Sequence, residues 1–333
     1  MLPRRHYEIV SHADLGDLAR QIYTLTQACF ATYPGVIEPS EAHRVWYLRR
    51  PGMDADLSSA ALFDGQVVSS VFITRVMMRL GGELVPVGMV DTVMTHPEHR
   101  RRGLASAVLS RALLGMRSEG FAAAALSTLL GSMPYHFYES LGFRLATPMD
   151  YLLYRGPSRP KAGTPEMLSP EEDGQAAAFL NAHFAEYEGY IPYDEPLWRW
   201  RKRERPAELP AEHCLLRDEQ GDIAAFASLC HAPILTGSGT QPVTIFTDLA
   251  LPEDGEGARL ALGAFLGCIP EGRPIGVLVA RCNEAEVRLL TACGFQPQYT
   301  EAAMILPFWP ALEAALARAP KRWYPVVESV IGV

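Results

Sequence analysis

Two stretches of this sequence lie 154 residues apart and resemble each other. Residues 28–37 read ACFATYPGVI and residues 182–191 read AHFAEYEGYI, and Trp46 matches Trp200 at the same offset. A repeat of about 150 residues has the size of a domain and is far longer than the unit of a solenoid. The chain of 333 residues is therefore predicted to contain two copies of one fold.

Each copy shows the same order of expected elements. An early helix leads into an aromatic-rich segment, a second helix, alternating strands, a further helix and a buried strand. The expected helices are residues 14–30, 40–49 and 103–118 in the first copy and 171–185, 195–202 and 257–267 in the second. The expected buried strands are residues 122–127 and 275–280. We expect the first copy to end at residue 155, a Pro-containing linker to span 156–170, and a C-terminal helix and tail to follow from 309 to 333.

Composition excludes several classes of protein. The hydrophobic fraction of 48% and the charged fraction of 20% exclude a disordered chain. No apolar run reaches the roughly 18 residues that a membrane helix needs, and the N-terminus lacks the apolar core of a signal peptide, so we expect a cytoplasmic protein. The six cysteines form no C-x-x-C pair, and the histidines show no convincing metal spacing, so no metal site is expected.

Charge is divided unevenly between the two copies. Residues 1–155 carry a net charge of +1 and residues 156–333 a net charge of −9, within a total of −8. An acidic half argues against a nucleic-acid surface. It suits a cationic small-molecule acceptor, although acidic surfaces commonly serve solubility alone.

One turn in the first copy has the features of an anion-binding site. An apolar run, residues 89–94, ends at a Pro-containing turn that leads into an Ala- and Leu-rich helix. The first amides of a helix lack intrahelical acceptors, and the helix dipole favours negative charge there. A solvated helix cap is the alternative for the arginines alone. The residues of the turn are Arg100, Arg101, Arg102, Gly103, Leu104 and Ala105.

This turn resembles the R/Q-x-x-G-x-G/A signature of the GNAT superfamily of acyl-CoA N-acyltransferases, which holds the pyrophosphate of CoA. A second signature of that family resembles residues 137–143, FYESLGF. The resemblance implies an α/β (α+β) fold of two tandem GNAT-like domains, each a mixed, mostly antiparallel sheet flanked by helices. It implies acetyl-CoA as cosubstrate, with Tyr138 beside the CoA sulfur as a general acid. It also implies backbone contacts to the pantetheine arm from Val93, Met94 and Thr95.

The general base and the acceptor site are less well defined by the sequence. Asp91, His96 and Glu38 are candidates for the base, and Asp91 is the one on the strand next to the expected reaction centre. The acceptor is expected to bind at the segment between the first two helices. The candidates there are Phe30, Tyr33 and Glu38. Trp46 is expected to pack in the core, because its counterpart Trp200 recurs in the second copy.

The second copy lacks both signatures. Acidic residues stand where the arginine turn would be, in the run PEDGEGA at 252–258, and the tyrosine position falls at or near Leu290. Like charges would repel a pyrophosphate there. Residues 171–308 are therefore predicted to be a degenerate copy, while residues 1–155 are the catalytic one. An active copy followed by a worn copy resembles the enhanced-intracellular-survival type of acetyltransferase, without its third, sterol-carrier-like domain.

Two functions remain open at this point. The first is an acetyl-CoA-dependent N-acetyltransferase acting on a primary amine of a small molecule or of an aminoacyl or peptide acceptor. The alternative is a non-catalytic module that binds or senses acyl-CoA. In either case we expect no nucleic-acid partner, no membrane and no metal, and a homo-oligomer is possible.

Overall fold

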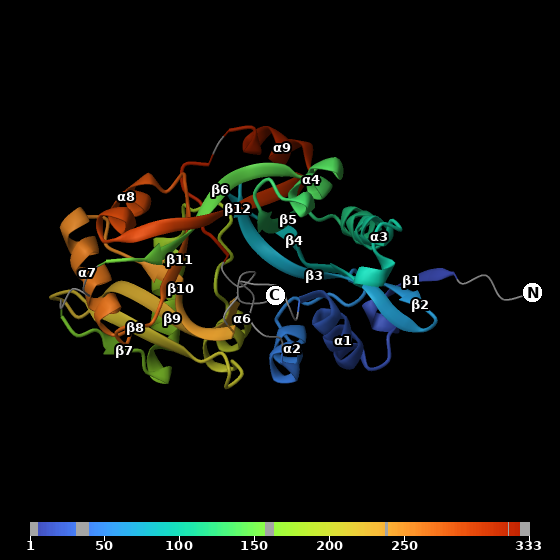
Figure 1. Ribbon diagram of the computed structural model, residues 1–333. Coiled ribbons are helices and arrows are strands. Elements are labelled where there is room, and N and C mark those ends of the chain that lie inside the picture. Colours follow the sequence, from blue (N-terminus) through green and yellow to red (C-terminus); the bar gives the residue numbers. More distant parts are fainter. Residues whose placement is uncertain (1–5, 31–39, 157–162, 237–238, 319, 327–333) are drawn as a thin grey trace, which may run out of the picture.

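A computed structural model describes residues 6–30, 40–156, 163–236, 239–318 and 320–326 (Figure 1). The strands of the first half are β1 (Tyr7–Ser11), β2 (Ser59–Phe63), β3 (Gln66–Leu80), β4 (Glu83–Thr95), β5 (Ala123–Leu129) and β6 (Arg144–Tyr154). Those of the second half are β7 (Glu166–Met167), β8 (Ala211–Arg217), β9 (Ile223–Thr236), β10 (Gly239–Ala250), β11 (Ile275–Ala280) and β12 (Phe295–Pro307).

The helices repeat in the same way. The first half has α1 (Leu18–Phe30), α2 (Glu41–Leu48), α3 (Leu104–Ser118) and α4 (Met133–Ser140). The second half has α5 (Asp173–His183), α6 (Glu195–Trp198), α7 (Gly255–Gly267) and α8 (Glu284–Ala292), and α9 (Pro310–Leu316) follows the last strand. α6 runs on into a π-helical turn at Arg199–Arg203.

All twelve strands belong to one continuous sheet in the order β1-β2-β3-β4-β5-β12-β6-β11-β10-β9-β8-β7. β12 lies beside β5 of the first half, and β6 lies beside β11 of the second half, so the two halves exchange their last strands. β6 and β12 pair with each other, antiparallel, at the centre (Figure 1). The only parallel neighbours among these strands are β4 with β5 and β10 with β11. The predicted mixed, mostly antiparallel sheet flanked by helices is confirmed.

Helices cover both faces of each half. In the first half, α3 and α4 pack on one face through Val108, Leu109 and Tyr138, whereas α1 packs on the other through Ile22 and Leu25. The second half repeats this arrangement, with α7 and α8 on one face and α5 and α6 on the other. Apolar side chains at helical spacing account for these contacts, because they place one stripe of each helix against the sheet.

A pair of tryptophans joins the halves on the α2 side of the sheet. The rings of Trp46 and Trp200 stack with centroids 4.4 Å apart and planes 11° apart. Each indole N–H donates to the backbone carbonyl of the other residue, at 3.2 Å from Trp46 and 3.0 Å from Trp200. The two residues are separated by the repeat offset, so they form a self-complementary contact across a local two-fold axis. Trp46 is thus a packing residue.

The boundary expected at residue 155 separates the two sequence repeats, but the sheet does not divide there. β6 ends at Tyr154 and is already part of the second half's sheet. The segment 156–170, expected as a linker, contains the two-residue strand β7 and the start of a 3-10 turn at Pro170–Glu172. The C-terminal helix expected after residue 308 is α9, Pro310–Leu316.

Three further observations concern membrane-spanning helices, metal ligands and cysteines. Within the described ranges, no helix is long and apolar enough to cross a membrane. The same residues contain no group of three or more His, Cys, Asp or Glu side chains placed to hold a metal ion. The six cysteines are free thiols.

Strand exchange predicts that the first half is unstable alone. Residues 1–156 lack β12, which pairs with β5 and contributes Ala302, Met304 and Leu306 to the core of the first half. Without it, β5 keeps an unpaired edge and the core loses buried apolar surface. We expect residues 1–156 expressed alone to aggregate or to show no cooperative unfolding by circular dichroism.

Co-expression with residues 157–333 is the control. The two pieces should purify as a one-to-one complex by size-exclusion chromatography, because each supplies the other's missing strand. A stable, monomeric 1–156 fragment with a cooperative melting transition would contradict the exchange.

Candidate active site

The neighbouring strands β4 and β5 separate from each other in the middle of the first half. β4 and β5 pair only between Val87–Met89 and Ala123–Ala125. Beyond these pairs β4 stays hydrogen-bonded to β3, while β5 pairs with β12 on its other side. The edge of β4 that faces β5 therefore has no strand partner from Val90 onward, and its backbone groups are available to an extended ligand.

A bulge lies on β4 at this point. Thr92 and Val93 together oppose the single residue Val71 on β3, between the pairs Phe72–Asp91 and Ser70–Met94. Thr92 is buried and has a φ of 48°, a conformation that β-branched residues rarely adopt. Such strain is retained where the surrounding structure fixes it and is common at functional sites.

The arginine turn connects β4 to α3. Gly103 is the N-cap of α3 at φ 75°, and Arg101 also has a positive φ, 58°. A Cβ added at Gly103 would meet no atom within 4 Å, so the glycine faces open space. In the described part of the chain, the amides of Arg101, Arg102 and Gly103 donate no backbone hydrogen bond. Together with the first amides of α3, they form a concave row of donors suited to an anion.

Two arginine side chains brace this turn. Arg100 Nε donates to the carbonyl of Thr95 at 3.1 Å. Arg102 donates to the Tyr7 hydroxyl at 2.7 Å and to the carbonyl of Glu98 at 3.2 Å. All three arginines of the turn are exposed, so their positive charges surround the donor row.

The remaining residues expected to contact CoA fall into two groups. The side chains of Met94 and Leu104 are buried in the core, which leaves only their backbone groups for a ligand. Val93, Thr95 and Ala105 are partly exposed. The structure therefore brings all nine expected residues together, along the end of β4, the turn and the start of α3.

Tyr138 lies on α4, on the same face of the sheet as α3. Its side chain is 8% exposed and packs against Phe137 and Phe143. Burial, followed by the negative charge of Asp91, raises the pKa of the Tyr138 hydroxyl above its ordinary value. The phenol therefore stays protonated at neutral pH, as a proton donor must.

Asp91 occupies β4 two residues beyond the last β4–β5 pair. Its Oδ1 accepts a hydrogen bond from Thr92 Oγ1 at 2.9 Å, and its Oδ2 lies 3.9 Å from a guanidinium nitrogen of Arg50. Burial raises the pKa of Asp91 to about 6, against the lowering effects of Thr92 and Arg44. A carboxylate with this pKa is ionised at neutral pH and still basic enough to accept a proton.

The other candidates are placed less centrally. His96 caps the short 3-10 helix at Pro97–His99, where its Nδ1 accepts from the amide of Glu98 at 3.3 Å. Phe30 ends α1 and packs partly against the core beneath that helix. Tyr33 and Glu38 lie outside the described residues.

Sequence reasoning missed a buried basic group on α2. Arg44 is fully buried, Arg50 is 6% exposed, and the carboxylate of Asp91 is beside them. Arg44 and Tyr47 are three residues apart, so they share a helix face. The three-residue spacing of Arg44 and Tyr47, on a helix whose Trp46 was expected in the core, was the feature of the sequence that could have indicated a buried arginine.

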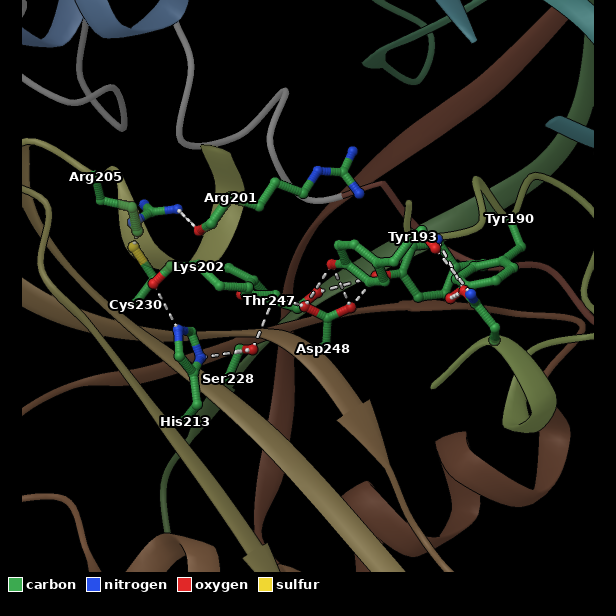
Figure 2. Close-up of polar contacts among 12 residues, drawn as sticks. Tyr190, Tyr193, Arg201, Lys202, Arg205, His213, Ser228, Cys230, Thr247 and Asp248 are labelled. Atoms are coloured by element: carbon green, nitrogen blue, oxygen red, sulfur yellow. Dashed lines mark hydrogen bonds and ion pairs between the residues drawn. The ribbon is translucent and has the colours of Figure 1, made fainter. Parts of the chain in front are cut away.

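The second half lacks these features at the equivalent positions. At the N-terminus of α7, the carboxylate of Asp254 accepts from the amide of Gly257 at 2.6 Å, so an intramolecular anion satisfies the helix end. Leu290 is buried where Tyr138 stands in the first half. Asp248, like Asp91, lies two residues past the last parallel pair, but it is closed in by Lys202, Tyr193 and Tyr324 (Figure 2).

A cavity of about 200 Å³ remains in the second half, between β10, β11 and α8. Its lining includes Phe246, Val279 and Leu290 together with Glu253 and Glu286. Glu253 belongs to the acidic run that replaces the arginine turn, and Glu286 lies on α8, so the cavity is unsuited to a pyrophosphate.

Comparison with known proteins supports the first half's assignment. Residues 16–146 match the family described as "Acetyltransferase (GNAT) domain". No curated protein sequence matches the chain significantly.

Solved structures of similar fold cover both halves. A GCN5-related N-acetyltransferase from Anabaena variabilis superposes with a TM-score of 0.68 at 12% identity, over 92% of this chain and 74% of that one. A probable N-acyltransferase from Enterococcus faecalis gives 0.64 at 15% identity, over 91% and 73%. N-myristoyltransferase from Saccharomyces cerevisiae, solved with bound myristoyl-CoA, gives 0.69 at 12% identity, over 92% and 80%. At these sequence identities, the three superpositions show a similar fold and no more. The family match, the fold and the turn agree that residues 16–146 of this chain are a GNAT acetyltransferase domain.

Proposed function

We propose that the chain is an acetyl-CoA-dependent N-acetyltransferase that acylates a primary amine of a small molecule or of an aminoacyl or peptide acceptor. The observation that carries this proposal is the row of amides at Arg101–Gly103, which donate no backbone hydrogen bond within the described residues and follow the part of β4 that has separated from β5. A pyrophosphate at the turn and a pantetheine arm along β4 would accept hydrogen bonds from these groups.

The reaction places distinct demands on the site. The amine nitrogen attacks the thioester carbonyl, a C–N bond forms, the C–S bond breaks, and the amine loses a proton. In our proposal Asp91 accepts that proton, directly or through water, and Tyr138 donates one to the leaving thiolate. The protonated state of Tyr138 and the ionised state of Asp91 at neutral pH suit these roles.

The second half has a structural role in this proposal. It supplies β12 to the catalytic half and keeps its own α7 end occupied by Asp254. The tandem arrangement then corresponds to the enhanced-intracellular-survival type, with one working site per chain. A panel of amines with acetyl-CoA, read by release of free thiol, tests the activity and separates it from mere CoA binding.

Gly103 provides the test of CoA binding. Gly103→Val introduces a β-branched side chain at a φ of 75° and fills the open space above the turn. Affinity for acetyl-CoA, measured by calorimetric titration, should fall at least about tenfold. The wild-type protein should bind one acetyl-CoA per chain.

Gly120→Val is the matched control. Gly120 follows the other end of α3 at a φ of 80°, and a Cβ there also meets nothing within 4 Å. The control carries the same backbone penalty but should bind acetyl-CoA normally. Wild-type affinity in the Gly103 variant, or two equivalent sites per chain, would contradict the proposed cofactor site.

The Tyr138→Phe variant tests whether Tyr138 acts as a general acid or only packs in the core. Loss of the hydroxyl should lower kcat by about 10²–10⁴-fold, the usual range for general acid catalysis, while acetyl-CoA affinity stays nearly unchanged. Tyr135→Phe is the control, since Tyr135 is similarly buried on the same helix. An unchanged kcat in the Tyr138 variant would make that side chain a packing residue.

Asp91→Asn should change how stability depends on pH. The native protein holds the Asp91 proton up to about pH 6, whereas the unfolded chain releases it near 3.8. The wild type therefore loses stability as pH rises from about 4 to about 6, by up to about 3 kcal/mol, and the variant lacks this loss. Urea unfolding of both proteins between pH 4 and pH 8 measures the difference. Asp56→Asn, at an exposed position, should show no such trend; a constant difference between Asp91→Asn and wild type would rule out the raised pKa.

A further inference from the structure

Two buried arginines, Arg44 on α2 and Arg50 just beyond its end, keep guanidinium nitrogens that make no hydrogen bond within the described part of the chain. Arg44 has no exposed surface, and in the described part of the chain none of its three guanidinium nitrogens makes a hydrogen bond. Arg50 donates to Thr74 Oγ1 at 2.7 Å and to the carbonyl of Tyr47 at 2.8 Å, but its third nitrogen has no hydrogen-bond partner among the same residues. Burying a charge without a partner is costly, so these arginines indicate a missing anion.

The net charge of the group formed by Arg44, Arg50 and Asp91 follows from its members. Asp91 is the acid beside the two arginines, and its nearest approach to Arg50 is 3.9 Å, which is too long for a hydrogen bond. His43 lies on the same helix and is buried, and burial lowers its pKa to about 3, so its ring is neutral at pH 7. Among the residues that the structure describes, two guanidinium ions and one carboxylate give this group a net charge of +1. A single monoanion would neutralise that charge.

In the second half, the carboxylate of the equivalent aspartate, Asp248, has several hydrogen-bond donors. Lys202 Nζ donates to Asp248 and, at 2.9 Å, to Ser228 Oγ. The Tyr193 hydroxyl donates to both oxygens of Asp248 at 3.1 Å, and the Tyr324 hydroxyl donates to one of them at 2.5 Å (Figure 2). Asp91, its equivalent, has only the adjacent residue Thr92, through its hydroxyl and its backbone amide, as a hydrogen-bond donor among the described residues. The half with the CoA turn is therefore the half whose polar centre is incomplete.

The incomplete centre adjoins the expected reaction centre. Asp91 follows the last β4–β5 pair, and its charge acts on the hydroxyl of Tyr138. The Asp91 side chain is 17% exposed, so the group reaches solvent at this point. Asp91 is the most exposed member of the group, since Arg44 has no exposed surface and Arg50 is 6% exposed.

We propose that the acceptor carries a carboxylate close to its amine, as an amino acid does, and that Arg44 and Arg50 bind this carboxylate. The inference rests on the proposed acetyl transfer and names its substrate class. The ammonium group of such an acceptor pairs with Asp91, which takes up its proton, and the carboxylate supplies the monoanion that the arginines lack. A guanidinium fork matches a carboxylate in shape and donates two parallel hydrogen bonds to it, which a lone apolar amine cannot replace.

Matched pairs of acceptors test the substrate class. L-Phenylalanine is compared with 2-phenylethylamine, and L-leucine with 3-methylbutylamine, with acetyl-CoA and thiol release as the readout. Each pair differs only by the carboxylate. The wild type should favour the amino acid by at least about tenfold in kcat/KM, because a site built for a polar group discriminates strongly against the analogue without it.

Arg44→Met removes the charge and keeps the side chain's length. The KM for the amino acids should rise at least about tenfold, while the values for the two decarboxylated amines stay the same, and Arg44→Lys should restore part of the loss. Arg49→Met is the control, because Arg49 is exposed at the end of the same helix. The ligand-free Arg44→Met protein should melt at a higher temperature than the wild type, since an unpaired buried charge has been removed.

A binding measurement makes the result independent of turnover. N-Acetyl-L-phenylalanine should raise the melting temperature of the wild type but not of Arg44→Met, and N-acetyl-2-phenylethylamine should raise neither. Equal kcat/KM within the pairs, or a folded Arg44→Met protein with unchanged KM and unchanged stabilisation by the N-acetyl amino acid, overturns the carboxylate site. Failure of acetyl-CoA to bind, or thiol release with no amine at all, instead contradicts the acetyltransferase function, and the melting experiment still decides whether the carboxylate binds.

Discussion

The pairing of β6 with β12 is the interaction on which the rest of the structure depends. Each strand ends one half of the chain and lies next to the fifth strand of the other half, so neither sheet is complete without its partner. Backbone hydrogen bonds must be satisfied once they are buried, and the centre of a twelve-stranded sheet is buried on both faces. The exchange therefore joins two repeats into one cooperative unit. The stacked Trp46–Trp200 pair adds a second contact between the halves, made by the helices that cover the sheet.

This pairing gives the second half a structural role whether or not it binds a ligand of its own. The second half supplies a strand to the core beneath α3 and α4, the helices that position the turn and Tyr138. Its own equivalents could diverge as long as the strand stayed. Asp254 fills the helix end, Leu290 fills the tyrosine position, and Lys202 neutralises Asp248. The helix end at Gly257 and the carboxylate of Asp248 are therefore satisfied by groups of the chain itself.

Much of the architecture was readable in the sequence, because helices and turns are specified locally. The helix expected at 103–118 is α3, Leu104–Ser118, and the strand expected at 275–280 is β11. The exchange of β6 and β12 was not readable, since the alternation of a strand predicts its faces but not its neighbours. The turn was found because its glycine and arginines have a known chemistry. Arg44 was missed because a buried arginine and an exposed one look alike in a helix of eight residues.

The features that sequence rules handle poorly are concentrated in the first half and close to one another. Among the described residues, Thr92 and Arg101 adopt positive φ, the amides of the turn donate no backbone hydrogen bond, and no guanidinium nitrogen of Arg44 makes a hydrogen bond. Each of these features costs stability, so a chain that had only to fold would be expected to lack them. In our proposal, ligands complete them: a pyrophosphate at the turn and an anionic group at the arginines. These unsatisfied backbone and side-chain groups, more than the sequence similarity between the halves, are what point to the first half as the one that binds ligands.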